Sequence, residues 1–244
     1  MILLRSLVFF FFMVLTIVFV AGPLSIIGIL LPYRQRCRVA NFWGGLNIKL
    51  LGAICGLDYE ISGLERIPQG GAIILAKHQS AWETLALRYL LPPEQAWVAK
   101  RELLWVPIFG WAMALVQPIM IDRKSGRKAV RQVIETGTMR LQQGRLVVIF
   151  PEGTRVAPGE HKRYGIGGAL LAEKSGFPII PIAHNAGIFW RRRDIKKYPG
   201  TVQVVVGPTI EPEGLSAAEI NRQVEEWIES TVAQLPQANG LEHK

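Results

Sequence analysis

Hydrophobic residues follow two patterns in this chain: one long continuous run at the start, then short separate segments. Residues 7–31 carry no charge and consist mostly of Leu, Ile, Val and Phe. A transmembrane helix needs about 20 such residues. Gly22 and Pro23 interrupt the run, so it is either a single kinked span or a helical hairpin that enters one leaflet and returns. A cleaved signal peptide is a third interpretation because Arg5 precedes the run, but the run is longer than the usual apolar core of such a peptide.

Beyond residue 38, short apolar segments alternate with stretches that have helical spacing or capping residues. The apolar segments resemble buried strands and lie at residues 58–62, 72–76, 96–99, 118–121, 146–150, 179–183 and 201–206. Helices are predicted at residues 41–56, 125–143, 164–175 and 216–236, with a further one ending at Leu90. Ser125 is expected to cap one helix, and Ser216 with Glu219 forms a capping box for the last.

These patterns predict how the chain is divided. Residues 1–35 form a membrane-embedded segment, residues 36–236 a single α/β domain and residues 237–244 a flexible tail. The domain is expected to hold a central mixed, mostly parallel sheet flanked by helices, preceded by the N-terminal membrane helix or helical hairpin. Two prolines accompany the apolar strand at residues 179–183, which favours an edge position or a tight entry for it.

The charge distribution narrows the range of partners. Lys and Arg number 28 against 19 Asp and Glu, which gives a net charge of +9. A basic surface favours nucleic acid, anionic lipid or a phosphorylated substrate. No nucleic-acid-binding motif is present, and the apolar run favours lipid. Arg34, Arg36 and Arg38 follow this run, so the positive-inside rule predicts a protein of the cell inner membrane with its main domain on the cytoplasmic face.

Cysteines and histidines give no signal for a metal or a disulfide. Cys37 and Cys55 lack the spacing of a metal site or a disulfide framework, and we expect plain thiols in a reducing compartment. None of the four histidines lies in a metal-ligand motif. We therefore expect no metal and no bound cofactor.

A polar segment follows the predicted strand at residues 72–76, where active sites of α/β sheets collect. Within it, His78 can take up a proton near neutral pH if a carboxylate holds its ring. Glu83 lies about one helical turn further along and is able to reach the imidazole. Taken alone, such a pair is more often a surface pair or a helix cap.

Basic residues follow three further predicted strands. The sequence Phe-Pro-Glu-Gly-Thr-Arg occupies residues 150–155, where Gly153 permits a sharp turn or a close approach to a ligand and Arg155 suits a phosphate. Lys100 and Arg123 stand at the ends of two other strands, and basic residues at neighbouring strand ends can converge on a phosphate. The alternatives are an ordinary Pro-Gly turn and solvated charges.

These segments occur together, in this order and after a membrane segment, and the combination resembles the glycerolipid acyltransferase family, in particular bacterial 1-acylglycerol-3-phosphate acyltransferases. The family's first block has His, four residues and an acid, as His78 and Glu83 do here. Its second block ends in Arg, here Arg123, and its third is the intact sequence at residues 150–155. A Pro-rich apolar strand, here residues 180–182, is the fourth, and the resemblance covers about residues 58–207.

Two departures from the family's pattern bear on the site. The usual acid is Asp, whereas this chain has Glu83, whose extra methylene moves the carboxylate. Gln117 stands where the second block commonly has Gly, which can alter the acceptor pocket.

The resemblance implies direct transfer of a fatty acyl chain from acyl-CoA or acyl-carrier protein to the free hydroxyl of lysophosphatidic acid, giving phosphatidic acid. His78 would act as the base and Glu83 as its partner. The implied phosphate-binding residues are Arg155, Arg123, Lys100, Glu152, Gly153 and Thr154. No Ser or Cys nucleophile is implied, and the chain has no GxSxG elbow.

Three alternatives remain open at this point. The acceptor can be another lysophospholipid or lipid, within the same chemistry. The chain can be an inactive membrane-anchored lipid-binding protein, with Glu83 as the symptom. A nucleic-acid-binding protein, the third class, lacks a supporting motif.

Two further segments have two interpretations each. Residues 103–111 are apolar and rich in Trp, and they line an acyl path or rest on the bilayer, or else they are ordinary core. Residues 191–193, with Lys196 and Lys197, form a basic patch for a lipid surface, or else a solvated loop.

Overall fold

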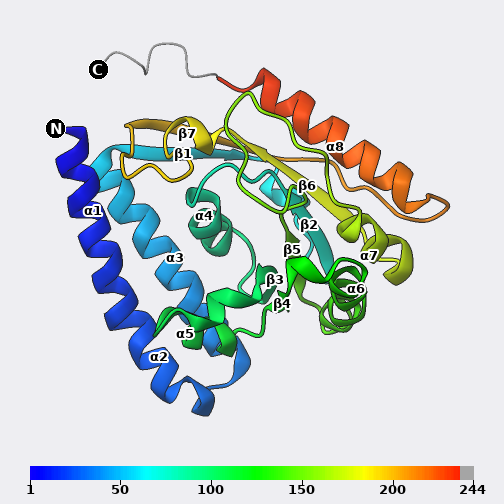
Figure 1. The fold of residues 1–244 in the computed structure, drawn as a ribbon, viewed down its shortest axis with the longest axis horizontal. Helices are drawn as coiled ribbons and strands as arrows, with labels where there is room; N and C mark the ends of the chain where they lie inside the picture. Colours follow the sequence, from blue (N-terminus) through cyan, green and yellow to red (C-terminus); the bar gives the residue numbers. More distant parts are fainter. Residues whose placement is uncertain (237–244) are drawn as a thin grey trace.

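A single sheet forms the centre of the computed structural model, which describes residues 1–236 (Figure 1). Within these residues it has seven strands in the order β1-β7-β6-β2-β5-β3-β4. The strands are β1 (Leu57–Ser62), β2 (Ala72–Ala76), β3 (Gln95–Lys100), β4 (Ile119–Ile121), β5 (Leu146–Ile149), β6 (Ile179–His184) and β7 (Gly200–Val206). Every pair of neighbours is parallel except β6 and β7. The predicted mixed, mostly parallel sheet is confirmed.

Helices cover both faces of this sheet (Figure 1). They are α1 (Ile2–Thr16), α2 (Gly22–Ile27), α3 (Tyr33–Cys55), α4 (Trp82–Leu90), α5 (Phe109–Leu115), α6 (Arg127–Gln142), α7 (Gly167–Ser175) and α8 (Ala217–Gln234). Side chains of α3 and α4 pack on one face, and those of α6, α7 and α8 pack on the other.

Strand β2 shows why its sequence is apolar throughout. All five of its residues are fully buried, and successive residues point to opposite faces of the sheet. Ile74 belongs to the core under α3 and α4, whereas Ile73 and Leu75 belong to the core under α6, α7 and α8. A strand buried on both faces reads as a continuous apolar run, which is how the sequence predicted it.

The N-terminal apolar run is helical over Ile2–Leu30, with a mean hydropathy of 2.6 and 17% of its most apolar window buried. The chain does not reverse at Gly22 and Pro23. A π-helical turn (Ile17–Ala21) precedes the proline, which lies in the first turn of α2, where a missing N–H costs little. The chain turns after Leu31, and α3 then runs back along α1 (Figure 1). The predicted hairpin within residues 7–31 is therefore wrong.

Polar contacts join these two helices. The indole of Trp43 on α3 donates to the Thr16 hydroxyl on α1 at 3.1 Å, and the Asn47 amide contacts the same hydroxyl at 3.1 Å. The outer side of the N-terminal helix stays apolar and exposed, as at Phe19 and Leu30. An exposed apolar helix of this length associates with a membrane. The expected boundary between residues 35 and 36 falls inside α3, and this division stays a prediction.

Two predicted helix starts are wrong. The hydroxyl of Ser125 donates to the Asp122 carbonyl at 2.6 Å, so it does not cap α6, which begins at Arg127 after Gly126 with a φ of 50°. Helix α7 begins at Gly167, later than predicted. Tyr164 is instead buried in the core, with its hydroxyl bonded to a carboxylate of α8.

Of the two alternatives given for the strand at residues 179–183, an edge position and a tight entry, the edge position is wrong, because β6 lies inside the sheet. Pro181 is tolerated there for a geometric reason. Its carbonyl accepts from the N–H of Gly207, one residue beyond the end of β7. In an antiparallel pair a residue's N–H and C=O point the same way, so the missing N–H faces the point where pairing ends. The flexible tail predicted at residues 237–244 lies outside the described residues.

The capping prediction for the last helix is testable. The Ser216 hydroxyl accepts from the Glu219 N–H at 3.3 Å. Ser216→Ala should lower the free energy of unfolding by about 1 kcal/mol, because an N–H of the first turn loses its acceptor. Thermal unfolding in detergent measures this change. Ser230→Ala on the same helix is the matched control, and an equal effect of both variants would contradict the capping role.

Candidate active site

His78 and Glu83 form a contact at the end of β2. The carboxylate oxygen Oε1 of Glu83 lies 2.8 Å from Nδ1 of His78. The same oxygen accepts from the N–H groups of Gln79 at 2.9 Å and Ser80 at 2.7 Å. These donors lie in the loop between β2 and α4, and Glu83 lies in the first turn of α4. Glu83 therefore joins this loop to the helix and holds the imidazole at the same time.

The protonation of this pair follows from its surroundings. Burial opposes ionisation of Glu83, but the hydrogen bond with His78, the nearby His184 and the Ser80 N–H outweigh it and lower the pKa of Glu83. An ionised Glu83 requires the proton of the His78 ring to be on Nδ1. Nε2 then carries the free lone pair, which is the arrangement of a general base.

The loop after β5 holds His78 from two further sides. The ring of Phe150 stacks on the imidazole, with centroids 4.0 Å apart and planes 12° apart. The His78 N–H donates to the carboxylate of Glu152 at 3.1 Å, and its carbonyl accepts from the Val156 N–H at 2.8 Å. The first and third motif blocks are thus one interlocked unit.

Behind His78 lies a buried group of charges that the sequence did not reveal. The ammonium of Lys77 lies 2.7 Å from Glu229 of α8 and 3.2 Å from Glu152, and it is almost completely buried. The Tyr164 hydroxyl donates to Glu229 at 2.7 Å. Burial raises the pKa of Glu152 to about 7, although Lys77 and the His78 N–H act in the opposite direction.

This placement changes the role of Glu152, which was expected among the phosphate-binding residues. Its carboxylate is buried against Lys77 and the backbone of His78, and the residue is 2% exposed. It does not line the cavity described next. A charged side chain directly before His78, at the end of a buried strand, is the one sequence signal for this group.

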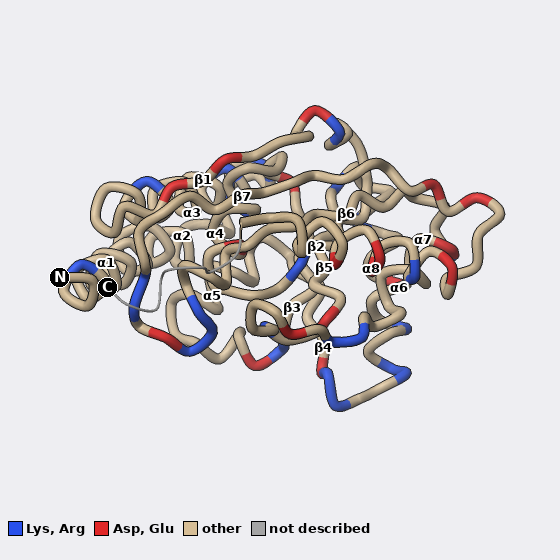
Figure 2. Tube along the Cα trace, turned by 90° about the horizontal axis from the view of Figure 1, so that it is seen from above, with Lys and Arg blue, Asp and Glu red and all other residues tan. Residues whose placement is uncertain are grey.

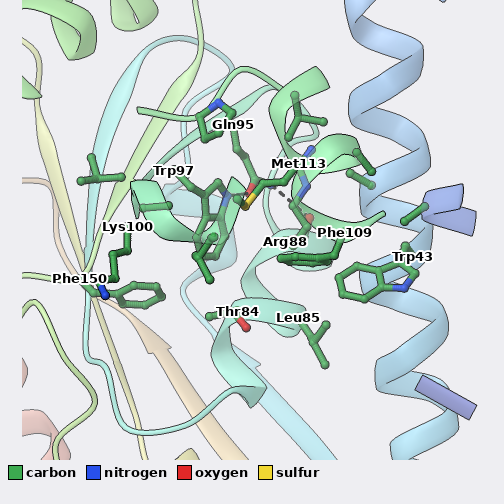
Figure 3. A pocket seen from close by; sticks show the side chains of 18 of the residues that line it. Trp43, Thr84, Leu85, Arg88, Gln95, Trp97, Lys100, Phe109, Met113 and Phe150 are labelled. Carbon is green, nitrogen blue, oxygen red and sulfur yellow. Dashed lines mark hydrogen bonds between the residues drawn. The ribbon is translucent and has the colours of Figure 1, made fainter. Parts of the chain in front are cut away.

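His78 lines a cavity of about 560 Å³. Figure 3 shows this cavity from close by, with Phe150, Trp97 and Trp43 among its lining side chains. Its walls are mainly apolar side chains from the N-terminal helices, α3, α4, β3 and α5, including Leu24, Trp43, Leu85, Trp97, Phe109 and Met113. Within residues 103–111, Leu103 and Phe109 line the cavity, whereas Trp105 and Trp111 are exposed. The two functional interpretations of that segment therefore apply to different side chains.

Cationic side chains surround the cavity near His78. Lys100, Arg123 and Arg155 all line it, as does Thr154. A hydrogen bond joins Arg123 to the carbonyl of Gly153. Gly153 has a φ of 67°, which favours glycine. Lys100 also pairs with Glu102 at 3.0 Å. Basic segments gather beside β4 and before α6 (Figure 2).

Two arginines of the basic segment that has two interpretations, a lipid-surface patch or a solvated loop, also line this cavity. They are Arg192 and Arg193, in the loop between β6 and β7. Lys197 in the same loop is 3% exposed, so it is not part of a surface patch. Its ammonium lies over the ring of Trp190, 4.7 Å from the centroid. The sequence showed a run of basic residues but could not show which of them line the cavity and which are buried.

Gln117 shows why glycine is common at its position. Its φ is 54°, a conformation that costs a side chain about 1 kcal/mol or more. Its amide oxygen accepts from Arg145 at 2.9 Å, which holds the side chain. Gln117 does not line the cavity, so its effect on the acceptor pocket is indirect.

A histidine base held by a buried carboxylate, at the end of a parallel strand and beside an apolar cavity with a cationic rim, defines a transferase of lipid acyl groups. The chain belongs to the acyltransferase family, whose sequence model matches residues 58–185. The predicted resemblance is confirmed.

Individual relatives extend the similarity to most of the chain. A 1-acyl-sn-glycerol-3-phosphate acyltransferase of Pseudomonas aeruginosa is 44% identical over 93% of this chain and 90% of its own length. One of Cocos nucifera is 28% identical over 86% of this chain and 68% of its own length. The crystal structure of the Thermotoga maritima 1-acyl-sn-glycerophosphate acyltransferase has the same fold, with a TM-score of 0.79, 24% identity and coverage of 96% and 95%.

The buried carboxylate behind His78 predicts a pH-dependent stability. The pKa of Glu152 is raised from 4.5 to about 7, so its contribution is present below pH 4.5 and is lost as the pH rises through 7. The free energy of unfolding of wild type minus that of Glu152→Gln should fall by roughly 2–3 kcal/mol between pH 4.5 and 8. Chemical denaturation in detergent across this range measures the difference.

Glu65→Gln is the control for this experiment, because Glu65 lies in an exposed turn that follows β1, and two other strands separate β1 from β2 in the sheet. Its difference from wild type should stay constant across the same pH range. A constant difference for Glu152→Gln as well would show that folding does not raise the pKa of Glu152.

Proposed function

We propose that this chain transfers a fatty acyl group from a thioester to the free hydroxyl of 1-acylglycerol-3-phosphate, giving phosphatidic acid. The observation that carries the proposal is the His78–Glu83 contact on the wall of an apolar cavity with cations at its rim. The relatives from Pseudomonas aeruginosa and Cocos nucifera bear the name of this activity.

The chemistry needs two proton movements, and His78 can perform both. Nε2 removes the proton of the acceptor hydroxyl while that oxygen attacks the thioester carbonyl carbon. The tetrahedral intermediate then breaks its C–S bond, and the leaving thiolate takes the proton from the imidazolium. Glu83 stabilises the imidazolium between these events, because its ionised Oε1 lies 2.8 Å from Nδ1. No step requires a metal or a cofactor.

The acceptor phosphate would lie against Arg155, Arg123 and Lys100, with Thr154 beside them. Glycerol places the reacting hydroxyl and the phosphate on adjacent carbons, so the phosphate site must be close to His78. Arg155 belongs to the loop that also holds His78, since the next residue, Val156, donates to the His78 carbonyl at 2.8 Å. This shared loop supports a phosphorylated acceptor over a neutral lipid.

The N-terminal apolar helix would hold the site at the membrane, where the lipid acceptor is dissolved. The N-terminal helix lines the cavity through Val20 and Leu24, so an acyl chain can pass from the bilayer into the site. Arg34 and Arg36 follow this helix, and their charge supports the cytoplasmic face of the inner membrane. The donor would be acyl-CoA or acyl-carrier protein. The alternative of an inactive lipid-binding protein was based on Glu83 replacing Asp. Glu83 nevertheless contacts His78, so this ground no longer supports the alternative.

Removal of the base tests the proposed function directly. His78→Ala should abolish thiol release from acyl-CoA in the presence of lysophosphatidate. Glu83→Gln should lower kcat by about 10²–10⁴-fold, because an amide cannot stabilise the imidazolium. A thiol-trapping dye and the formation of phosphatidic acid are the two readouts. Turnover by His78→Ala equal to that of wild type would refute the proposed base.

The phosphate site makes a separate prediction about the two substrates. Arg155→Ala should raise the KM for lysophosphatidate about tenfold or more and leave the KM for acyl-CoA nearly unchanged, because the lost interaction is a charge-assisted hydrogen bond to the acceptor. Initial rates with each substrate varied in turn measure both constants. A larger change in the donor KM would place the acceptor phosphate elsewhere.

A further inference from the structure

The cavity carries more cationic side chains than one phosphate monoester needs. Lys100, Arg123 and Arg155 come from loops that follow β3, β4 and β5. Arg192 and Arg193 come from the loop between β6 and β7, outside the four motif blocks. The second group has no role in the acyl transfer described above.

The loop that carries the second group has a defined conformation. The N–H of Lys197 donates to the Ser6 hydroxyl of α1 at 2.8 Å, and the ammonium of Lys197 lies over the ring of Trp190. The Lys196 N–H donates to the side chain of Asp194 at 2.9 Å, which closes a turn. Trp190 and Lys197 lie on either side of the two arginines, so their contact with each other and the bond to Ser6 hold both ends of the segment between them.

Within this loop the arginines face the site. A guanidinium nitrogen of Arg192 donates to the carbonyl of Arg155 at 3.0 Å, which joins the loop to the third motif block. Arg193 has a φ of 63°, a conformation that side chains rarely adopt and that costs about 1 kcal/mol or more. Local strain that places a cation at a cavity is typical of a binding function.

We propose that Arg192 and Arg193 bind the phosphate at the end of the pantetheine arm of the acyl donor. This proposal rests on the proposed function. Acyl-CoA and acyl-carrier protein share this group: in both, the thioester is attached through pantetheine to a phosphate. The planar guanidinium, with its parallel N–H donors, suits such a phosphate.

The geometry of the substrates assigns the two cation groups to different phosphates. In the acceptor the phosphate is on the carbon next to the reacting hydroxyl, so it must lie close to His78. In the donor the long pantetheine arm separates the phosphate from the reacting carbonyl, so that phosphate must lie further out. Arg155 is half-buried, in the loop whose next residue, Val156, donates to the His78 carbonyl, whereas Lys100 and Arg123 are exposed like Arg192 and Arg193. Arg155 therefore suits the acceptor phosphate, and Arg192 and Arg193, which come from a different loop, suit the donor phosphate.

The test compares donors that have and lack this phosphate. In Arg192→Gln/Arg193→Gln, the KM for acyl-CoA and for acyl-4′-phosphopantetheine should rise about tenfold or more. The KM for acyl-pantetheine, which lacks the phosphate, should be unchanged, as should the KM for lysophosphatidate. Wild type should prefer acyl-4′-phosphopantetheine to acyl-pantetheine, and the variant should lose that preference.

A matched control removes the same charge from the same loop. Arg191→Gln/Lys196→Gln changes two basic residues that do not line the cavity, and its donor KM values should stay within about twofold of wild type. Turnover of acyl-pantetheine by the Arg192→Gln/Arg193→Gln variant needs His78, Glu83 and the acceptor site but no donor phosphate, so its persistence separates this proposal from the proposed function.

Three results would overturn the proposal. One is an equal loss with acyl-CoA and acyl-pantetheine, which would assign the arginines to membrane binding or folding. Another is a loss with acyl-carrier protein alone, which would assign them to the acidic surface of that protein. The third is a rise in the lysophosphatidate KM without a donor effect, which would place them in the acceptor site.

Discussion

The site depends on one oxygen atom, Oε1 of Glu83. It accepts from the His78 ring and from the N–H groups of Gln79 and Ser80, all within 2.9 Å. The ring and the two N–H groups belong to the loop that follows β2, and Glu83 belongs to the first turn of α4. The carboxylate therefore fixes the strand–helix junction and the imidazole together, so that a change in either alters the orientation of the base.

This junction is supported by a second set of charges that reaches across the molecule. Lys77 precedes His78 and contacts Glu152 of the third motif block and Glu229 of α8. A buried ammonium is tolerated only when its charge is compensated. The last helix, which lies beyond residues 58–185, is thus part of the structure that holds the base in place. His78 links the two groups of charges, because its ring contacts Glu83 and its N–H donates to Glu152.

The sequence predicted the sheet well, because a strand buried on both faces leaves an apolar run that needs no knowledge of its neighbours. The local spacing of His78 and Glu83 suggested a contact between them, but only the resemblance to the family, carried by the other motif blocks, identified them as the base and its partner. Glu229 and Arg192 were not, because their roles depend on contacts with residues far away in the chain. The predicted start of α7 at Tyr164 was wrong because this side chain is buried in the core and the next N–H, of Gly165, donates to the distant Pro151 carbonyl.

Glu83 stands where the family usually has Asp, and its two oxygens have different surroundings. Oε1 takes every donor, and Oε2 is buried without a partner among the described residues. A single atom thus contacts both the ring and the backbone donors of the loop before α4. Burying Oε2 without a hydrogen-bond donor costs free energy of desolvation, and its share of the negative charge is not compensated by a donor. A carboxylate solvated by fewer donors favours the imidazolium more strongly, which is the species that acyl transfer requires the site to stabilise.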